Sequence, residues 1–212
     1  IVFTWMSEHS LGSSWDIGYE IRNKTLGVVK NETRVNNYSG NNQQEPKITA
    51  LQDGGFAIAW QSYYQRSHWD VYMQRYDESG TRVGQTEIEV NTYYSNAQNI
   101  NDITQLSDGS IIVVWQSSGV QSGIGFVQDT SGWGVYAQKF SSEGVKIGRE
   151  FLINQEYMNS TQQWGSIAPL KDGNFVIAWD SNSQPNDSSG YGIFGKIYDG
   201  ASHGMSEIFQ IN

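Results

Sequence analysis

The chain has 212 residues, a formal net charge of −9 at pH 7 and no cysteine. Because nucleic-acid binding depends on clustered Lys and Arg, which this acidic chain lacks, its composition excludes nucleic acid as a partner. Without cysteine there are no disulfides and no thiolate ligands for a structural zinc. No apolar run approaches the roughly 20 residues that span a bilayer, so we predict no membrane insertion.

The sequence repeats one unit four times. The strings IVFTW, FAIAW, IIVVW and FVIAW end in four tryptophans, Trp5, Trp60, Trp115 and Trp179. An aromatic-rich segment follows each string, and each unit closes on a branched aliphatic residue and an asparagine. Such self-similarity is typical of repeat architectures, whose units share one core. We therefore predict a single repeat domain over 1–212, with repeats at approximately 1–36, 37–91, 92–154 and 155–212.

The predicted elements follow one order in each repeat. In the second repeat, a strand at Ile48 to Leu51 and a strand at Phe56 to Trp60 flank Asp53-Gly54-Gly55, and Asp-Gly between apolar runs favours a hairpin. A second hairpin joins Val71 to Tyr76 with a strand near Glu87 to Val90. The first repeat has no counterpart of the strand at 48–51, so it lacks its first strand.

Four short antiparallel strands in about 50 residues are typical of a propeller blade. In the strand at 56–60 both faces are apolar, which predicts burial between sheets stacked on either side. The predicted fold is therefore an all-β, β-propeller-like array of four roughly 50-residue, four-stranded blades. Each of Trp5, Trp60, Trp115 and Trp179 is expected in a blade core.

Three explanations for the missing first strand stay open. The strand lies outside this sequence, the first blade has three strands, or another molecule donates the strand. In the last case an unpaired edge would lead to self-association and a filament, unless the contacts close into a ring.

The segments LQDGGFAIAWQS, DVYMQRYDESGTRVG and EIEVN resemble a repeat found many times over in large secreted and surface proteins of bacteria and some protists. The resemblance covers almost the whole chain. It implies a propeller-like extracellular module with an adhesive or structural role and no known reaction. The loops at 65–68, 119–131 and 182–189 lack the Gly/Asp-rich run of that family, so no calcium site is carried over.

Asn-x-Ser/Thr sequons exceed the roughly two or three expected by chance. They occur at Asn23, Asn31, Asn37, Asn159 and Asn186. All fall in predicted turns or loops, as glycan acceptors must if they are to stay exposed. They predict a secreted, N-glycosylated protein at an extracellular or cell-surface location, and the alternative is that they are ordinary polar loop residues.

The residues give little sign of catalysis. The three histidines, at 9, 68 and 203, stand at non-equivalent repeat positions, so neither a metal site nor a nucleophile relay can be drawn from them. Asp53, Asp108 and Asp172 recur at one repeat position, which indicates turns. We predict no enzyme activity, no metal and no cofactor.

An aromatic residue opens the third strand of every repeat, beside the loop whose length varies most: Trp15, Trp69, Trp133 and Tyr191. Repeat proteins often bind ligands at such variable loops, and these rings could stack on sugars. The alternative is that they cap the blade edges. The leading hypothesis is a non-enzymatic structural or adhesive module that self-assembles into a filament or surface layer. A lectin-like carbohydrate-binding propeller is the alternative.

Overall fold

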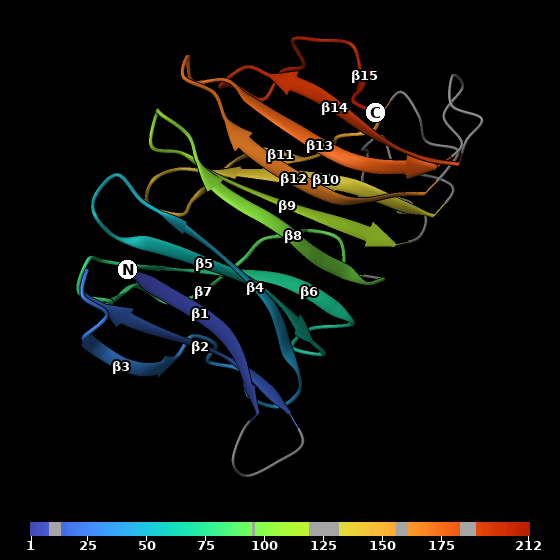
Figure 1. Cartoon of the computed structure of the whole chain (residues 1–212). Coiled ribbons are helices and arrows are strands. Elements are labelled where there is room, and N and C mark those ends of the chain that lie inside the picture. The colour runs from blue at the N-terminus through green and yellow to red at the C-terminus, as the bar shows by residue number, and fades with distance from the viewer. Residues whose placement is uncertain (9–13, 95, 119–131, 156–160, 183–189) are drawn as a thin grey trace.

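The computed structural model is all-β and confirms the predicted fold class (Figure 1). The structure describes residues 1–8, 14–94, 96–118, 132–155, 161–182 and 190–212. Within these ranges no helix has the length and apolar character needed to cross a membrane. The strands, in chain order, are β1 (Val2–Glu8), β2 (Trp15–Arg22), β3 (Val28–Arg34), β4 (Gln43–Ala50), β5 (Phe56–Tyr63), β6 (Trp69–Tyr76), β7 (Arg82–Glu89), β8 (Gln98–Gln105), β9 (Ile111–Ser118), β10 (Trp133–Phe140), β11 (Lys146–Leu152), β12 (Gln162–Pro169), β13 (Phe175–Asn182), β14 (Tyr191–Tyr198) and β15 (Phe209–Gln210).

The strands form four antiparallel sheets, and each sheet takes its strands consecutively from the chain. The first sheet holds β1-β2-β3, and the others hold β4-β5-β6-β7, β8-β9-β10-β11 and β12-β13-β14-β15. The first sheet thus lacks one strand, as predicted, and β1 lies at its edge. β4, β8 and β12 take the corresponding edge of the other three sheets.

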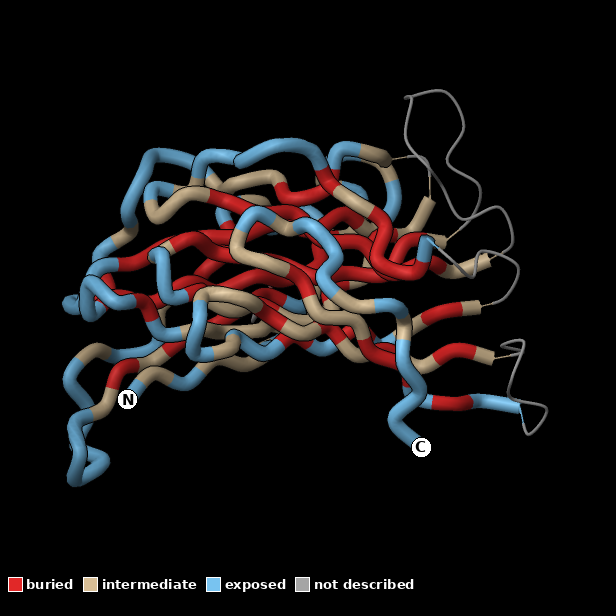
Figure 2. Tube along the Cα trace, turned by 90° about the horizontal axis from the view of Figure 1, so that it is seen from above, coloured by how far each residue is buried: buried red, intermediate tan, exposed pale blue. Residues whose placement is uncertain are grey.

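The sheets stack in chain order, with the first and last at opposite ends of the molecule (Figure 1). Buried residues run through the middle of the stack, and exposed residues gather at its turns and outer surfaces (Figure 2). In β5 every residue from Phe56 to Ser62 is buried. Both faces of this strand are covered, because a sheet packs on each side of it.

Three of the four repeated tryptophans lie in apolar layers between sheets. Trp60 packs between the first and second sheets, Trp115 between the second and third, and Trp179 between the third and fourth. None of them exposes more than 1% of its surface. The indole N–H of Trp60 donates to Gln43 (3.3 Å) and that of Trp115 to Gln98 (3.1 Å).

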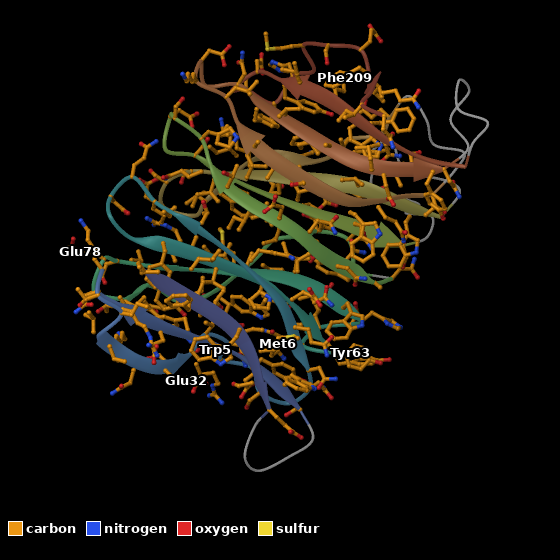
Figure 3. All side chains as sticks on the ribbon, viewed as in Figure 1. Trp5, Met6, Glu32, Tyr63, Glu78 and Phe209 are labelled. Atoms are coloured by element: carbon orange, nitrogen blue, oxygen red, sulfur yellow. The ribbon has the colours of Figure 1, made fainter. Side chains whose placement is uncertain are left out.

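Trp5 departs from this pattern, and its expected place in a blade core was wrong. In the other sheets the tryptophan faces the preceding sheet, and among the described residues no sheet precedes β1. Trp5 is therefore only partly buried, and Ile1 and Phe3 on the same face are exposed. Figure 3 shows Trp5 and Met6 on this first strand.

The asparagine that closes each repeat fastens the end of the repeat to its third strand. The side-chain oxygens of Asn36, Asn91 and Asn154 accept from the backbone N–H of Ile17 (2.8 Å), Val71 (2.7 Å) and Val135 (3.0 Å), respectively. All three asparagines are buried. Buried amide groups need such partners, which explains why an asparagine recurs here.

The recurring aspartates make turns. Asp53 and Asp108 each accept from the backbone N–H two residues later, at 2.9 Å. The glycine between the bonded residues is left-handed, with φ of +87° at Gly54 and +82° at Gly109. This arrangement is a side-chain turn that only a short polar residue followed by glycine forms readily.

Candidate functional site

The edge strands β4, β8 and β12 each carry an irregularity in register at an equivalent place. It falls between Gln44 and Lys47, between Ile100 and Asp102, and between Gln163 and Ser166. A bulge of this kind bends a strand and re-aims a side chain. These strands are consequently longer than the sequence predicts, because pairing resumes on the far side of each bulge.

Two bulge residues are left-handed without being glycine: Glu45 with φ of +55° and Trp164 with φ of +57°. Such a backbone costs about 1–3 kcal/mol and persists only where its surroundings fix it. An aromatic side chain in this conformation is unusual, since its bulk clashes with the backbone. Trp164 therefore needs a stabilising environment.

Side chains of the third sheet provide that environment. The Gln116 oxygen accepts from the backbone N–H of Trp164 (3.0 Å), and the Asn101 oxygen accepts from that of Gly165 (3.2 Å). Asp102 then accepts from Ile167 N–H (3.0 Å). The bulge of β12 is thus held by groups on β8 and β9, which fix where the Trp164 ring stands.

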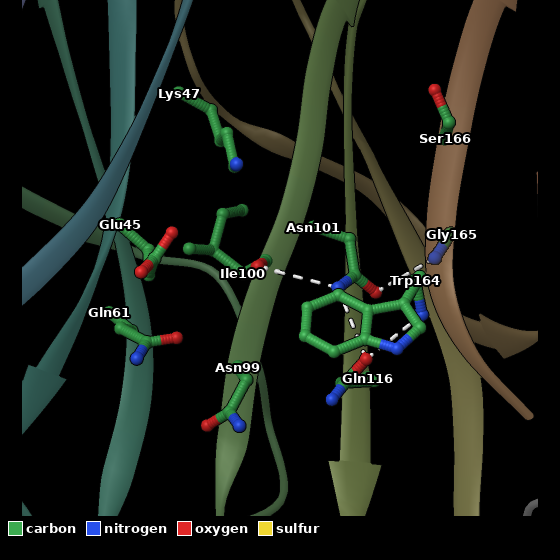
Figure 4. A pocket seen from close by; sticks show the side chains of 10 residues that line it. All are labelled: Glu45, Lys47, Gln61, Asn99, Ile100, Asn101, Gln116, Trp164, Gly165 and Ser166. Carbon is green, nitrogen blue, oxygen red and sulfur yellow. Dashed lines mark hydrogen bonds between the residues drawn. The ribbon is translucent and has the colours of Figure 1, made fainter. Parts of the chain in front are cut away.

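The bulges border a pocket of about 350 Å³ between β4, β8 and β12 (Figure 4). The Trp164 ring lies on one side of it next to Asn101 and Gln116, and Glu45 and Gln61 lie on the opposite side. Trp164 is 68% exposed, the highest value among the large apolar side chains of the described residues. A broad exposed ring thus faces a set of amide groups across a groove.

The polar lining of this groove is mostly neutral. Among the described residues that line it, only Glu45 and Lys47 carry charge, and the other polar side chains are the amides of Gln61, Asn99, Asn101 and Gln116 and the Ser166 hydroxyl. Amides offer both donors and acceptors, so they match hydroxyl groups of either orientation. The groove is suited to an uncharged, hydroxyl-rich ligand.

Asp180 pairs with Gln163 across β12 and β13 and does not line the groove. Burial raises the pKa of the Asp180 carboxyl, and the hydrogen bond it accepts from the Gln163 backbone offsets part of this effect. Its equivalents in the second and third sheets are Gln61 and Gln116. This carboxyl therefore holds its proton to a higher pH than a free aspartate does.

The predicted sugar-stacking residues lie elsewhere. Each of these aromatic residues is the first residue of the third strand of its repeat, and none of them lines the groove. They are Trp15 in β2, Trp69 in β6, Trp133 in β10 and Tyr191 in β14. Tyr191 is 61% exposed and Trp15 38% exposed, while Trp69 and Trp133 are half-buried. They are spread over four sheets, so they do not form one site.

Three of the predicted glycosylation positions are described, and all three are exposed: Asn23, Asn31 and Asn37. Asn23 and Asn37 lie in turns or loops, but Asn31 lies within β3, so the expectation that every sequon falls outside a strand was wrong. Asn23 caps its own turn by accepting from Thr25 and Gly27 N–H, both at 2.9 Å. Asn159 and Asn186 lie outside the described residues. Occupancy of these sequons stays a prediction.

Trp164 was not predicted from the sequence as a site residue. It stands in a first strand whose equivalent positions hold Glu45 and Ile100, so the repeat pattern gives no reason to expect an aromatic residue there. That break in the pattern, followed by a glycine, was the available signal. In the described part of the chain no three His, Asp or Glu side chains come together as metal ligands would.

No protein-family model matches the chain, and no curated protein sequence matches it either. Solved structures do match its fold. An endo-arabinase from Bacteroides thetaiotaomicron VPI-5482 aligns over 100% of this chain and 76% of its own, with a TM-score of 0.55 and 11% identity. An ulvan lyase of a new polysaccharide lyase family, bound to -[GlcA(1-4)Rha3S]-, aligns over 99% of this chain and 54% of its own (TM-score 0.58, 12% identity).

A thermostable family-43 glycoside hydrolase aligns over 100% of this chain and 73% of its own, with a TM-score of 0.50 and 10% identity. At these identities the likeness establishes the fold alone. It nevertheless overturns two expectations, the non-enzymatic structural or adhesive module and the absence of enzyme activity. The first rested on the family resemblance and the second on the lack of a recognisable catalytic pattern, yet hydrolases and lyases share this architecture. Self-association through the β1 edge receives no support and stays a prediction.

Proposed function

We propose that this protein binds a neutral carbohydrate in the groove between β4, β8 and β12. The observation that carries the proposal is Trp164, an exposed ring in a left-handed bulge at the side of a groove lined with amides. The backbone of this bulge is held by the hydrogen bonds that it donates to side chains of the third sheet. A fold shared with an arabinase, a lyase and a glycoside hydrolase supports a carbohydrate as the ligand.

The chemistry of the groove matches a sugar ring. A pyranose or furanose has a face of C–H groups, which packs on an aromatic ring, and a rim of hydroxyls, which pair with amides. Trp164 supplies the ring, while Asn101 and Gln116 lie beside it (Figure 4). Because Gln116 and Asn101 also hold the bulge, stacking and hydrogen bonding come from one connected unit.

Charge favours a neutral glycan over an anionic one. The whole chain carries a net charge of −9, and no arginine is among the described residues that line the groove. Sulfated or uronic-acid polymers would be repelled by the overall charge and would find only Lys47 as a cation in the groove. Glu45 and Lys47 carry opposite charges, so the described lining of the groove has no net charge. An extracellular location, with glycans on the exposed Asn23, Asn31 and Asn37, belongs to the same proposal.

A glycan panel tests the proposal. The wild-type protein is heated with arabinan, galactan, xylan or β-glucan, and in parallel with ulvan and polygalacturonate as anionic controls. Because a ligand that binds the native state raises the melting temperature, at least one neutral polymer should raise Tm and the anionic polymers should not. Reducing ends are measured in the same samples, which reports any cleavage. A Tm unchanged by every neutral polymer, without new reducing ends, would contradict the proposal.

A further inference from the structure

A second group of aromatic rings, two exposed and two half-buried, lies at the loop end of the second sheet, where β5 passes into β6. Tyr63 ends β5 and Trp69 begins β6, and their ring centroids are 4.8 Å apart. The centroid of the Tyr64 ring lies 4.4 Å from that of Tyr63, in an edge-on arrangement. It lies 5.4 Å from that of His68, with the two ring planes tilted. We call these four residues the aromatic platform, and Figure 3 labels Tyr63 within it.

The backbone of the platform is strained at its most exposed ring. Tyr64 is left-handed, with φ of +53°, and 49% exposed. Its N–H donates to the His68 carbonyl (2.7 Å), and its carbonyl accepts from the Tyr38 hydroxyl (3.1 Å). A bulky residue in this conformation destabilises the chain, whereas glycine would adopt it freely. The ring is therefore held outward at a cost in stability.

Side-chain hydrogen bonds attach the loop that carries this ring to β7. Arg66 Nη1 donates to both carboxylate oxygens of Glu89, each at 2.9 Å, and the Arg66 guanidinium packs over the Tyr94 ring at 3.5 Å. Gln65 donates to Glu87 (2.7 Å). A strained aromatic residue on a fixed loop is pre-organised for contact, because little conformational entropy is lost when a ligand docks.

Strand β5 connects the groove with the platform. Gln61 lines the groove, and Tyr63 lies two residues further along β5 on the same face, about 7 Å away by the rise of a strand. Tyr64 follows at the exposed tip. A ligand that reaches from Gln61 to the platform must be longer than one sugar ring.

We infer that the aromatic platform is a second stacking subsite, so that the protein binds a polysaccharide chain rather than a single sugar. This inference rests on the proposed function of the groove. The first subsite is formed by Trp164 with its amides, and the second by Tyr64 with Tyr63 and Trp69. Affinity then rises with chain length until both subsites are filled, since the second contact forms without a second loss of free translation.

The test uses oligosaccharides prepared by partial hydrolysis of whichever of arabinan, galactan, xylan or β-glucan raises Tm most. Calorimetry gives Kd for each length from disaccharide to hexasaccharide, for wild type, Tyr64→Gly and Leu26→Gly. Leu26 is the matched control, because it is also left-handed (φ of +64°) and 54% exposed but belongs to the first sheet. Both glycine variants should fold and be at least as stable as wild type, because glycine relieves the strain.

The expected result is that the wild type and Leu26→Gly bind the hexasaccharide at least about tenfold more tightly than the disaccharide. Tyr64→Gly should keep the disaccharide affinity and lose this gain. A wild-type Kd independent of length, or a gain that survives in Tyr64→Gly, overturns the inference while the groove proposal stands. Failure of the wild type to bind any oligosaccharide overturns both.

Discussion

Replacing Trp115 with alanine is expected to lower the free energy of unfolding by about 3–5 kcal/mol, the usual cost of removing a buried tryptophan. Trp115 is 1% exposed, belongs to the layer between the second and third sheets, and donates its indole N–H to Gln98. The substitution leaves both a cavity and an unpaired buried Gln98 oxygen. Urea unfolding followed by circular dichroism measures the loss.

Trp5→Ala is the matched control. Trp5 stands at the equivalent repeat position but is only partly buried, so its removal leaves a surface depression that water fills. We expect a cost well below that of Trp115→Ala, on the order of 1 kcal/mol. Equal losses in the two variants would contradict this expectation and show that the Trp5 face of the first sheet is covered in solution.

Replacing Trp164 with alanine is expected to weaken binding of the neutral glycan by about 2 kcal/mol, which is roughly thirtyfold in Kd. The ring is the largest exposed apolar surface of the groove, and its position is fixed by Gln116 and Asn101. Its loss should leave stability nearly unchanged, because the side chain is 68% exposed. Calorimetric titration with the active glycan gives the change in Kd.

Two variants make this result specific. Trp164→Phe keeps a smaller ring and should retain part of the affinity. Tyr191→Ala removes a ring that is 61% exposed but does not line the groove, so it should bind like the wild type. The opposite pattern, with Tyr191→Ala weak and Trp164→Ala unaffected, would place sugar binding at the rings that open the third strands.

The sequence was sufficient for the fold because its signals are local and repeated. Asp-Gly turns, strands that are apolar on both faces and the closing asparagine each occur several times at fixed spacing. An assignment that is ambiguous in one repeat can therefore be made from the equivalent residues of the others. The exposure of Trp5 could not be predicted in this way. It depends on whether another sheet covers the strand, which the identity of the residue does not encode.

The groove was harder to predict for a related physical reason. Where Glu45 and Trp164 point depends on bulges, and in β12 the bulge is stabilised by Asn101, Asp102 and Gln116 from the neighbouring sheet. Those partners are roughly 50 to 65 residues away in the sequence, beyond any local pattern. The predicted class, a non-enzymatic structural or adhesive module, was wrong, because architecture alone does not separate structural modules from carbohydrate-active proteins.

Glycan binding in the groove is tested most directly by recording the indole N–H signals of the protein by two-dimensional NMR while the glycan that raises Tm is added. Trp164→Phe identifies the Trp164 signal by its disappearance. We expect this signal to shift progressively to saturation, while the signals of the buried Trp60, Trp115 and Trp179 stay in place. A saturating glycan that leaves the Trp164 signal unmoved would contradict binding in the groove.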